Sequence, residues 1–252
     1  MKLATLGRSG IRTSVLAVGT GTHGWAGASA QTKKGDGWLT RTLRGSAKLG
    51  VSFWDLADEY GSHAAASAAL RGVERSSLVL ATKTTATQRA ECGADVERFL
   101  SELGTDYLDI VLLHAVSGES WRECLAGSME SLREAKDRGK LRAAGVSIHS
   151  LAALRGAAEE PWVDVILARL NYAGTNMDAP PREVLPILRD AHAAGKGIYA
   201  MKVLGCGDLC ADVRRAVGFV AEAGCVDAMT IGPTEDGHLA ELAGVVEQLW
   251  PG

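Results

Sequence analysis

A chain of 252 residues with 46% hydrophobic and 23% charged residues has the composition of an ordinary globular protein, and its length suits one large α/β domain. The formal net charge of −3, without a dense lysine or arginine stripe, disfavours nucleic acid as a partner, and no apolar run is long enough to span a membrane. Five scattered cysteines and no apolar leader of the signal-peptide type indicate free thiols, so we expect a cytoplasmic protein without a membrane partner.

From the N-terminus, residues 2–14 alternate in short bursts about a Gly-Arg-Ser-Gly turn, which predicts a small β-hairpin. The rest of the chain alternates apolar runs of strand length with longer stretches of helical period. The predicted strands are 14–20, 51–57, 77–83, 107–115, 141–148, 163–170, 197–204 and 226–232, and the helical stretches include 40–50, 95–104, 124–140, 183–196 and 212–224. This alternation predicts an α/β fold, a (β/α)8 TIM barrel with an N-terminal β-hairpin, as one domain over residues 1–252.

The glycine-rich stretch 19–24, which reads GTGTHG, leaves a doubly wound dinucleotide-binding fold as the alternative. A dinucleotide fingerprint opens a helix, but the residues that follow this stretch have no helical period. We therefore interpret Gly19 and Gly21 as the end of the first barrel strand, at a point where a ligand comes close to the backbone.

Four polar residues occupy the same place in successive strand patterns. Asp55 and Tyr60 follow the second predicted barrel strand, Lys83 ends the third and His114 ends the fourth. The C-terminal ends of the strands of such a barrel converge on one face, where active sites are built, so we expect the four side chains to meet there. Each residue alone has a structural reading, Asp55 as a helix cap and His114 as a buried hydrogen-bonded histidine, and only the joint placement favours catalysis.

The chemistry of these four residues suits the protonation of an oxygen. A neighbouring ammonium on Lys83 favours the phenolate of Tyr60, which predicts a lowered tyrosine pKa and an easier proton transfer. Asp55 can hold Lys83 in place, and His114 can offer an N–H to a carbonyl oxygen. The set fits a reaction in which a hydride reaches the carbon of that carbonyl, with a nicotinamide cofactor as the hydride donor.

The stretch FWDLADEYG at 53–61 resembles the F-x-D-T-A-x-x-Y-G segment of the aldo-keto reductases. The positions of Lys83 and His114, the initial hairpin, GTGT, LGTDYLDIVLLH, GKLRAAGVS and GKGIYAMKVLG are similar too, so the resemblance covers essentially the whole chain. It implies a (β/α)8 barrel that reduces a small-molecule aldehyde or ketone with NADPH or NADH. By this resemblance Tyr60 is the general acid, Lys83 and Asp55 tune it, and His114 orients the carbonyl.

The resemblance also implies a set of cofactor-binding positions. They are Gly21, Thr22, Ser147, Asn171, Met201, Lys202, Leu204, Gly205, Ile231, Thr234, His238 and Glu241. Ile148 and Leu167 replace the family's usual Asn and Gln. No Lys or Arg near Pro233 and His238 is available to bind the 2′-phosphate of NADP, so NADP and NAD remain alternatives. The sequence has no long loop after the last helical pattern, from which we expect an open or small substrate pocket.

Two other functions stay open. The first is a metal-dependent barrel hydrolase or isomerase using Asp55, His114 and His149, which is disfavoured because no H-x-H or H-x-x-x-H spacing occurs, and we expect no metal. The second is a non-catalytic NAD(P)-binding sensor or partner subunit on the same barrel. We place His23, His63 and His149 in loops of the active face and interpret each as a surface or packing residue, with contact of one of them to the substrate as the alternative. The sequence does not predict the oligomeric state.

Overall fold

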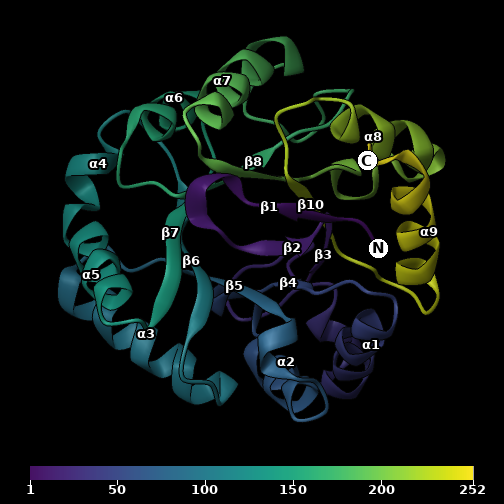
Figure 1. Ribbon diagram of the computed structural model, residues 1–252, viewed down its shortest axis with the longest axis horizontal. Coiled ribbons are helices and arrows are strands. Elements are labelled where there is room, and N and C mark those ends of the chain that lie inside the picture. Colours follow the sequence, from purple (N-terminus) through teal and green to yellow (C-terminus); the bar gives the residue numbers. More distant parts are fainter. Residues whose placement is uncertain (252) are drawn as a thin grey trace.

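Eight parallel strands close into a barrel in the computed structural model of this protein, which describes residues 1–251 (Figure 1). The barrel strands are β3 (Leu16–Gly19), β4 (Phe53–Asp55), β5 (Val79–Thr84), β6 (Leu108–Val116), β7 (Leu141–Ile148), β8 (Val165–Arg169), β9 (Gly197–Met201) and β10 (Ala228–Ile231). Each strand pairs with the next along the chain, and β10 pairs back with β3. The predicted barrel is confirmed. The doubly wound alternative is wrong, because its sheet is open and has two edge strands, whereas this sheet is closed.

Helices surround this barrel, as expected for crossover connections between parallel strands (Figure 1). They are α1 (Asp36–Lys48), α2 (His63–Leu70), α3 (Arg89–Leu103), α4 (Trp121–Cys124), α5 (Ala126–Asp137), α6 (Leu151–Glu159), α7 (Pro181–Ala193), α8 (Val213–Ala221) and α9 (His238–Leu249). The five predicted helical stretches are all present, whereas α2, which is rich in alanine and carries little contrast between an apolar and a polar face, was not predicted. Within residues 1–251 no helix combines the length and the apolar character that crossing a membrane requires.

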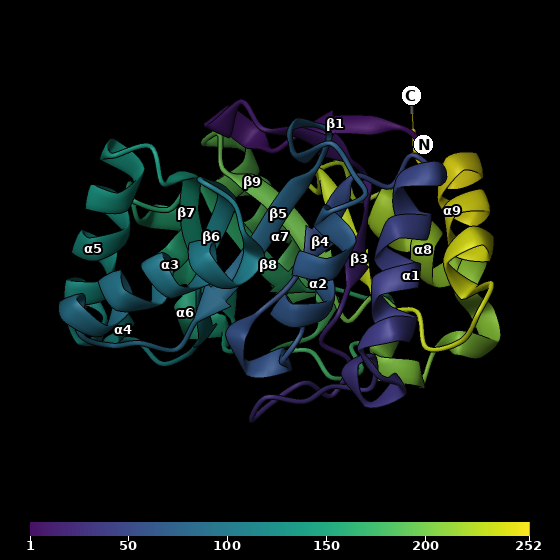
Figure 2. The same ribbon diagram turned by 90° about the horizontal axis from the view of Figure 1, so that it is seen from below.

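The predicted hairpin is also confirmed. Strands β1 (Leu3–Thr5) and β2 (Arg12–Ser14) pair antiparallel, and Figure 2 shows them across one end of the barrel, opposite the long loop that follows β3. The turn of the hairpin packs on the start of β9, where the Arg8 N–H donates to the carbonyl oxygen of Gly195 at 2.7 Å. Gly7 has a φ of +47° and lies so close to residues 195–197 that a Cβ would be 2.4 Å from their backbone. The hairpin thus closes the N-terminal end and leaves the other end open.

The interior of the barrel is filled with apolar side chains, except for one polar layer at the C-terminal ends of the strands. Leu6 and Ile11 of the hairpin segment are fully buried among inward-facing strand residues, and the rings of Phe53 and Tyr199 lie 5.2 Å apart. Because side chains alternate along a strand, the position two residues after Phe53 also faces inward, and it is Asp55. The polar layer therefore begins at the C-terminal ends of the strands.

The stretch 20–35 after β3 is a long loop rather than a helix start, as the sequence analysis expected, since α1 begins only at Asp36. Glu59 holds the middle of this loop, because its backbone oxygen accepts from Gly27 N–H at 2.9 Å and its carboxylate accepts from Ala26 N–H at 3.0 Å. Buried Gln31 holds its end through bonds to Thr22 and to the Pro233 oxygen. The loop is fixed over the C-terminal end of the barrel.

Candidate active site

The four polar strand-end residues lie together at the C-terminal end of the barrel. The Lys83 ammonium donates to Asp55 Oδ1 at 2.7 Å and to the Leu56 carbonyl oxygen at 2.7 Å. The same ammonium lies 4.8 Å from the centroid of the Tyr60 ring, and the Tyr60 hydroxyl is 3.3 Å from His114 Nε2. The juxtaposition expected from the strand pattern is present, although the residues come from β4, β5, β6 and the 3-10 turn η3 (Asp58–Tyr60).

Asp55 is the centre of this polar layer. Besides Lys83, it accepts hydrogen bonds from the Tyr199 hydroxyl at 3.2 Å and from Thr230 Oγ1 at 3.0 Å. Three donors from different strands thus compensate one buried carboxylate. Burial disfavours the charge of Lys83, but Asp55 and Tyr60 oppose this effect and raise the pKa of Lys83 above its usual value. Lys83 therefore remains an ammonium.

Tyr60 differs from the expectation in one respect. Burial raises the pKa of Tyr60 and outweighs Lys83, which lowers it, while Asp55 raises it further. The contribution of Lys83 has the sign that the sequence analysis expected, but the net direction in the free protein is wrong because the phenolate would be desolvated. Tyr60 accordingly holds its proton, which is the state that a general acid needs.

His114 is neutral at physiological pH. Burial, together with the smaller contributions of Lys83, His149 and Lys202, lowers the pKa of His114 to about 3. Its Nδ1 is buried without a hydrogen-bond partner in the described chain, whereas its Nε2 faces Tyr60. A proton on Nε2 leaves Nδ1 as an acceptor only, and the imidazole then presents an N–H beside the tyrosine hydroxyl.

The position of Tyr60 depends on close packing of the loop after β3. A Cβ at Gly21 would lie 2.2 Å from the Tyr60 ring, and a Cβ at Gly24 would lie 2.5 Å from it. On the other side, Arg98 of α3 holds the turn η3 by two bonds to the Asp58 carboxylate at 2.8 and 2.7 Å. The position of the Tyr60 ring therefore depends on Gly21, a residue that the sequence predicted to bind the cofactor.

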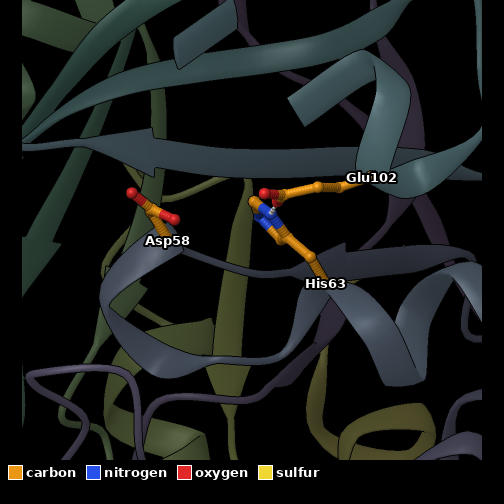
Figure 3. Close-up of side chains that lie close together, drawn as sticks. All are labelled: Asp58, His63 and Glu102. Atoms are coloured by element: carbon orange, nitrogen blue, oxygen red, sulfur yellow. Dashed lines mark hydrogen bonds and ion pairs between the residues drawn. The ribbon is translucent and has the colours of Figure 1, made fainter. Parts of the chain in front are cut away.

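Asp58, His63 and Glu102 form the one group of three potential metal ligands in residues 1–251 (Figure 3). His63 Nδ1 is 2.7 Å from Glu102, its Nε2 is 2.8 Å from Thr82 Oγ1, and the guanidinium of Arg98 bonds the carboxylates of both Asp58 and Glu102. A permanent cation is thus already paired with both carboxylates of the cluster and competes with a metal ion for them. The prediction that His63 lies in a loop of the active face is wrong, because it begins α2 and is 6% exposed with both ring nitrogens bonded.

A cavity of about 280 Å³ opens beside Tyr60 and extends to the loops that follow β9 and β10. Its wall contains Asp55 and Tyr60 and the predicted cofactor residues Gly21, Thr22, Met201, Lys202, Leu204, Ile231 and Thr234. The predicted residues Ser147, Asn171, Gly205, His238 and Glu241 are not part of that wall. Three wall residues that were not predicted are Cys206, Cys210 and Thr230, and of these only Thr230, a polar residue in a barrel-strand pattern, is indicated by the sequence.

Two predicted cofactor residues have unexpected surroundings. Asn171 is fully buried, and its amide donates to the oxygens of Thr175 and Lys202 and accepts from the N–H groups of Ala173 and Thr175. Its hydrogen-bonding capacity is used in holding the loop after β8, which argues against direct contact with a ligand. Ser147, near the end of β7, differs from Asn171 because its buried Oγ has no hydrogen-bond partner within the described residues and could bond to a ligand.

Lys202 is the cation of the cavity wall that has no ion pair within residues 1–251. It directly follows β9 and has a φ of 61°, in the left-handed region that non-glycine residues seldom adopt. Gly232, on the facing loop, has no room for a side chain, since a Cβ would lie 2.5 Å from Thr22 and Gln31. Such strained or close-packed backbone is typical of places where a ligand approaches.

Comparison with known proteins gives consistent matches. The sequence model of the aldo/keto reductase family matches residues 16–216. The chain is 26% identical over 224 residues to the L-galactose dehydrogenase of Arabidopsis thaliana, covering 82% of this chain and 66% of that enzyme. It is 28% identical over 171 residues to the aldo-keto reductase YhdN of Bacillus subtilis, covering 60% of this chain and 48% of the relative. The chain thus spans about two thirds of one of these curated relatives and about half of the other.

Solved structures are similar over nearly the whole chain. A structure from Pseudomonas aeruginosa assigned to the aldo-keto reductases has a TM-score of 0.82 and 25% identity, covering 98% of this chain and 95% of that one. An aldo-keto reductase from Klebsiella pneumoniae, solved in complex with NADPH, has a TM-score of 0.72 and 21% identity, covering 100% of this chain and 92% of that one. At the latter identity the likeness supports the fold alone.

Proposed function

The chain belongs to the aldo/keto reductase family, and we propose that it reduces the carbonyl group of a small aldehyde or ketone to an alcohol with NADH or NADPH. The observation that carries this proposal is the contact of a protonated Tyr60 with neutral His114 above the ion pair of Lys83 and Asp55. A proton donor, an N–H to orient an oxygen, and a buried cation are the groups that reduction of a carbonyl requires from a protein.

Each of the four residues has a separate task in this mechanism. The carbonyl oxygen accepts hydrogen bonds from the Tyr60 hydroxyl and from His114 Nε2, which fixes the carbonyl beside the cavity. A bound reduced nicotinamide would supply the hydride to the carbonyl carbon. Tyr60 then gives its proton to the oxygen, and the Lys83 ammonium stabilises the phenolate that remains. Asp55 holds Lys83 charged and in position throughout.

The surroundings of the cavity fit a dinucleotide. Lys202, in the cavity wall, has no ion pair within residues 1–251, and we assign its ammonium to the pyrophosphate. The buried Ser147 Oγ lies outside the wall without a hydrogen-bond partner among the described residues, and we assign it to the carboxamide of the nicotinamide. Met201 and Leu167 supply apolar wall where an aromatic ring can lie. Gly232 also lines the cavity, and it lets Thr22 and Gln31 of the loop after β3 pack against this end of the wall.

Two measurements test the proposal. Titration with NADPH and with NADH, followed by nicotinamide fluorescence, is expected to give saturable binding of at least one of them. The variant Tyr60→Phe is then expected to bind the cofactor with an unchanged Kd and to lose turnover of a carbonyl panel by about 100-fold or more. Normal turnover in this variant, or no binding of either cofactor, contradicts the proposal.

A sensor or partner subunit that binds the cofactor without catalysis is the second candidate. It is favoured by Leu167, which puts an apolar side chain into the cavity wall where the family usually has a hydrogen-bonding Gln. Cofactor binding without turnover of any carbonyl compound in the panel would select it. Rapid single-turnover reduction would exclude it.

A further inference from the structure

His149 and Arg169 form a hydrogen-bonded pair at the C-terminal face, beside the four proposed catalytic residues. Arg169 ends β8, and His149 directly follows β7. One Arg169 nitrogen, Nη2, is 2.7 Å from His149 Nδ1, and Nη1 is 2.8 Å from Asp178 Oδ1. A guanidinium has donors only, so His149 Nδ1 must be the acceptor in this bond. The ring proton of a neutral His149 therefore lies on Nε2.

The charged groups around His149 keep it neutral. Burial and, to a smaller extent, the cations Arg169, Lys202 and Lys83 together lower the pKa of His149 to about 4. His114, the other titratable ring that faces it, is itself neutral, and Asp178 is engaged by Arg169. His149 is thus a donor with a fixed tautomer over the physiological pH range.

The ring of His149 lies next to the ring of His114, the residue that we expect to bind the carbonyl oxygen. The half-buried ring of His149 meets the ring of His114 edge to face, with centroids 6.4 Å apart and an interplanar angle of 82°. Trp25, which is 56% exposed, has its ring 5.7 Å from that of His114, so three rings line the same region. A carbonyl oxygen held by Tyr60 and His114 places the neighbouring atoms of the substrate among these rings.

We propose that His149 is a specificity-determining residue whose Nε2–H binds an oxygen on the carbon next to the carbonyl, so that the protein prefers α-hydroxy and α-oxo carbonyl compounds. This inference rests on the proposed reductase function. Arg169 is a positioning residue, since it selects the tautomer of His149 and does not itself contact the substrate. A site built to bond an oxygen discriminates against the analogue that lacks it, because the donor is then left without a partner.

The tautomer is measured without any turnover. In nitrogen-15 NMR of the full chain, we expect His149 to carry its proton on Nε2 and to remain neutral down to about pH 5. In Arg169→Met the pKa of His149 should rise and both tautomers should appear, while circular dichroism verifies the fold. A wild-type His149 protonated on Nδ1, or one that titrates near its ordinary pKa, overturns the inference.

The substrate preference is measured with the matched pair 2-hydroxypropanal and propanal. Wild type should have a kcat/KM about tenfold higher for the hydroxylated member, and His149→Phe should abolish this ratio, whereas His149→Gln, which retains an N–H donor, should restore part of it. Tyr60→Phe should lower both rates and leave the ratio unchanged. An unchanged ratio in His149→Phe refutes the role of His149. If the wild type reduces neither these aldehydes nor any other compound of the carbonyl panel, the reductase function fails, and the substrate preference fails with it, whatever the NMR result.

Discussion

Replacement of Lys83 by methionine separates the structural cost of the buried ion pair from the role in proton transfer that we propose for it. Lys83 is fully buried and donates to Asp55 and to the Leu56 oxygen, so Lys83→Met leaves a buried carboxylate with only Tyr199 and Thr230 as donors. Breaking a buried pair at one partner costs about 3–5 kcal/mol. For a domain of this size this corresponds to a fall in Tm of roughly 6–20 °C.

The double variant Asp55→Asn/Lys83→Met gives the decisive comparison. Without the carboxylate, no charge is stranded, and we expect the double variant to recover more than half of the unfolding free energy that Lys83→Met loses. Neither variant should recover turnover, because Tyr60 has lost the cation that stabilises its phenolate, at a cost of about 100- to 10,000-fold. Urea unfolding and single-turnover kinetics measure the two effects. A double variant less stable than Lys83→Met would refute the reasoning.

Three other predictions concern the surroundings of the site. Gly24→Ala should displace the Tyr60 ring and reduce kcat by tenfold or more. The control is Gly45→Ala in α1, where an added Cβ meets nothing within 4 Å. This control should raise the free energy of unfolding by up to about 1 kcal/mol and leave kcat unchanged. Lys202→Met should raise the Kd of the cofactor and reduce the dependence of that Kd on salt, without a loss of Tm, as checked by fluorescence titration at two ionic strengths. The free energy of unfolding should fall as the pH falls from about 6.5 towards 4, because His149 binds a proton in the unfolded chain at a pH at which it stays neutral in the folded protein. The variant His149→Phe should show a smaller change of the unfolding free energy over this pH range.

The strand pattern was sufficient to place the four proposed catalytic residues because their positions follow from the closure of the barrel. Each of Asp55, Lys83 and His114 stands at the end of an apolar run, and parallel strands bring such ends to one face. Tyr60 needed in addition the turn η3, whose start after β4 is indicated by the acidic pair Asp58-Glu59. The residues at the strand ends, together with the rule that parallel barrel strands end on one face, therefore determine this part of the site.

What the sequence analysis could not predict depends on tertiary packing. The net direction of the Tyr60 pKa is set by how completely the loop after β3 covers its ring, and no motif records that coverage. His63 faces α3 and not the cavity because of the short crossing between η3 and α2. Asn171 has the residue type of a ligand-binding position, but its four hydrogen bonds within the chain are visible only once the loops after β8 and β9 are in place.

The charged layer at the end of the barrel is better explained by catalysis than by stability. Below it, layers such as that of Phe53 and Tyr199 fill the interior with aromatic and aliphatic side chains, and a further apolar layer would continue this packing. Buried ion pairs stabilise a fold little or not at all compared with apolar residues of similar volume. The chain nevertheless gives Asp55 three donors from three other strands, an arrangement that holds one ammonium charged beside one phenol. A protein that needed only the barrel would gain nothing from this layer, so its presence argues for proton transfer at Tyr60 and against a purely structural role.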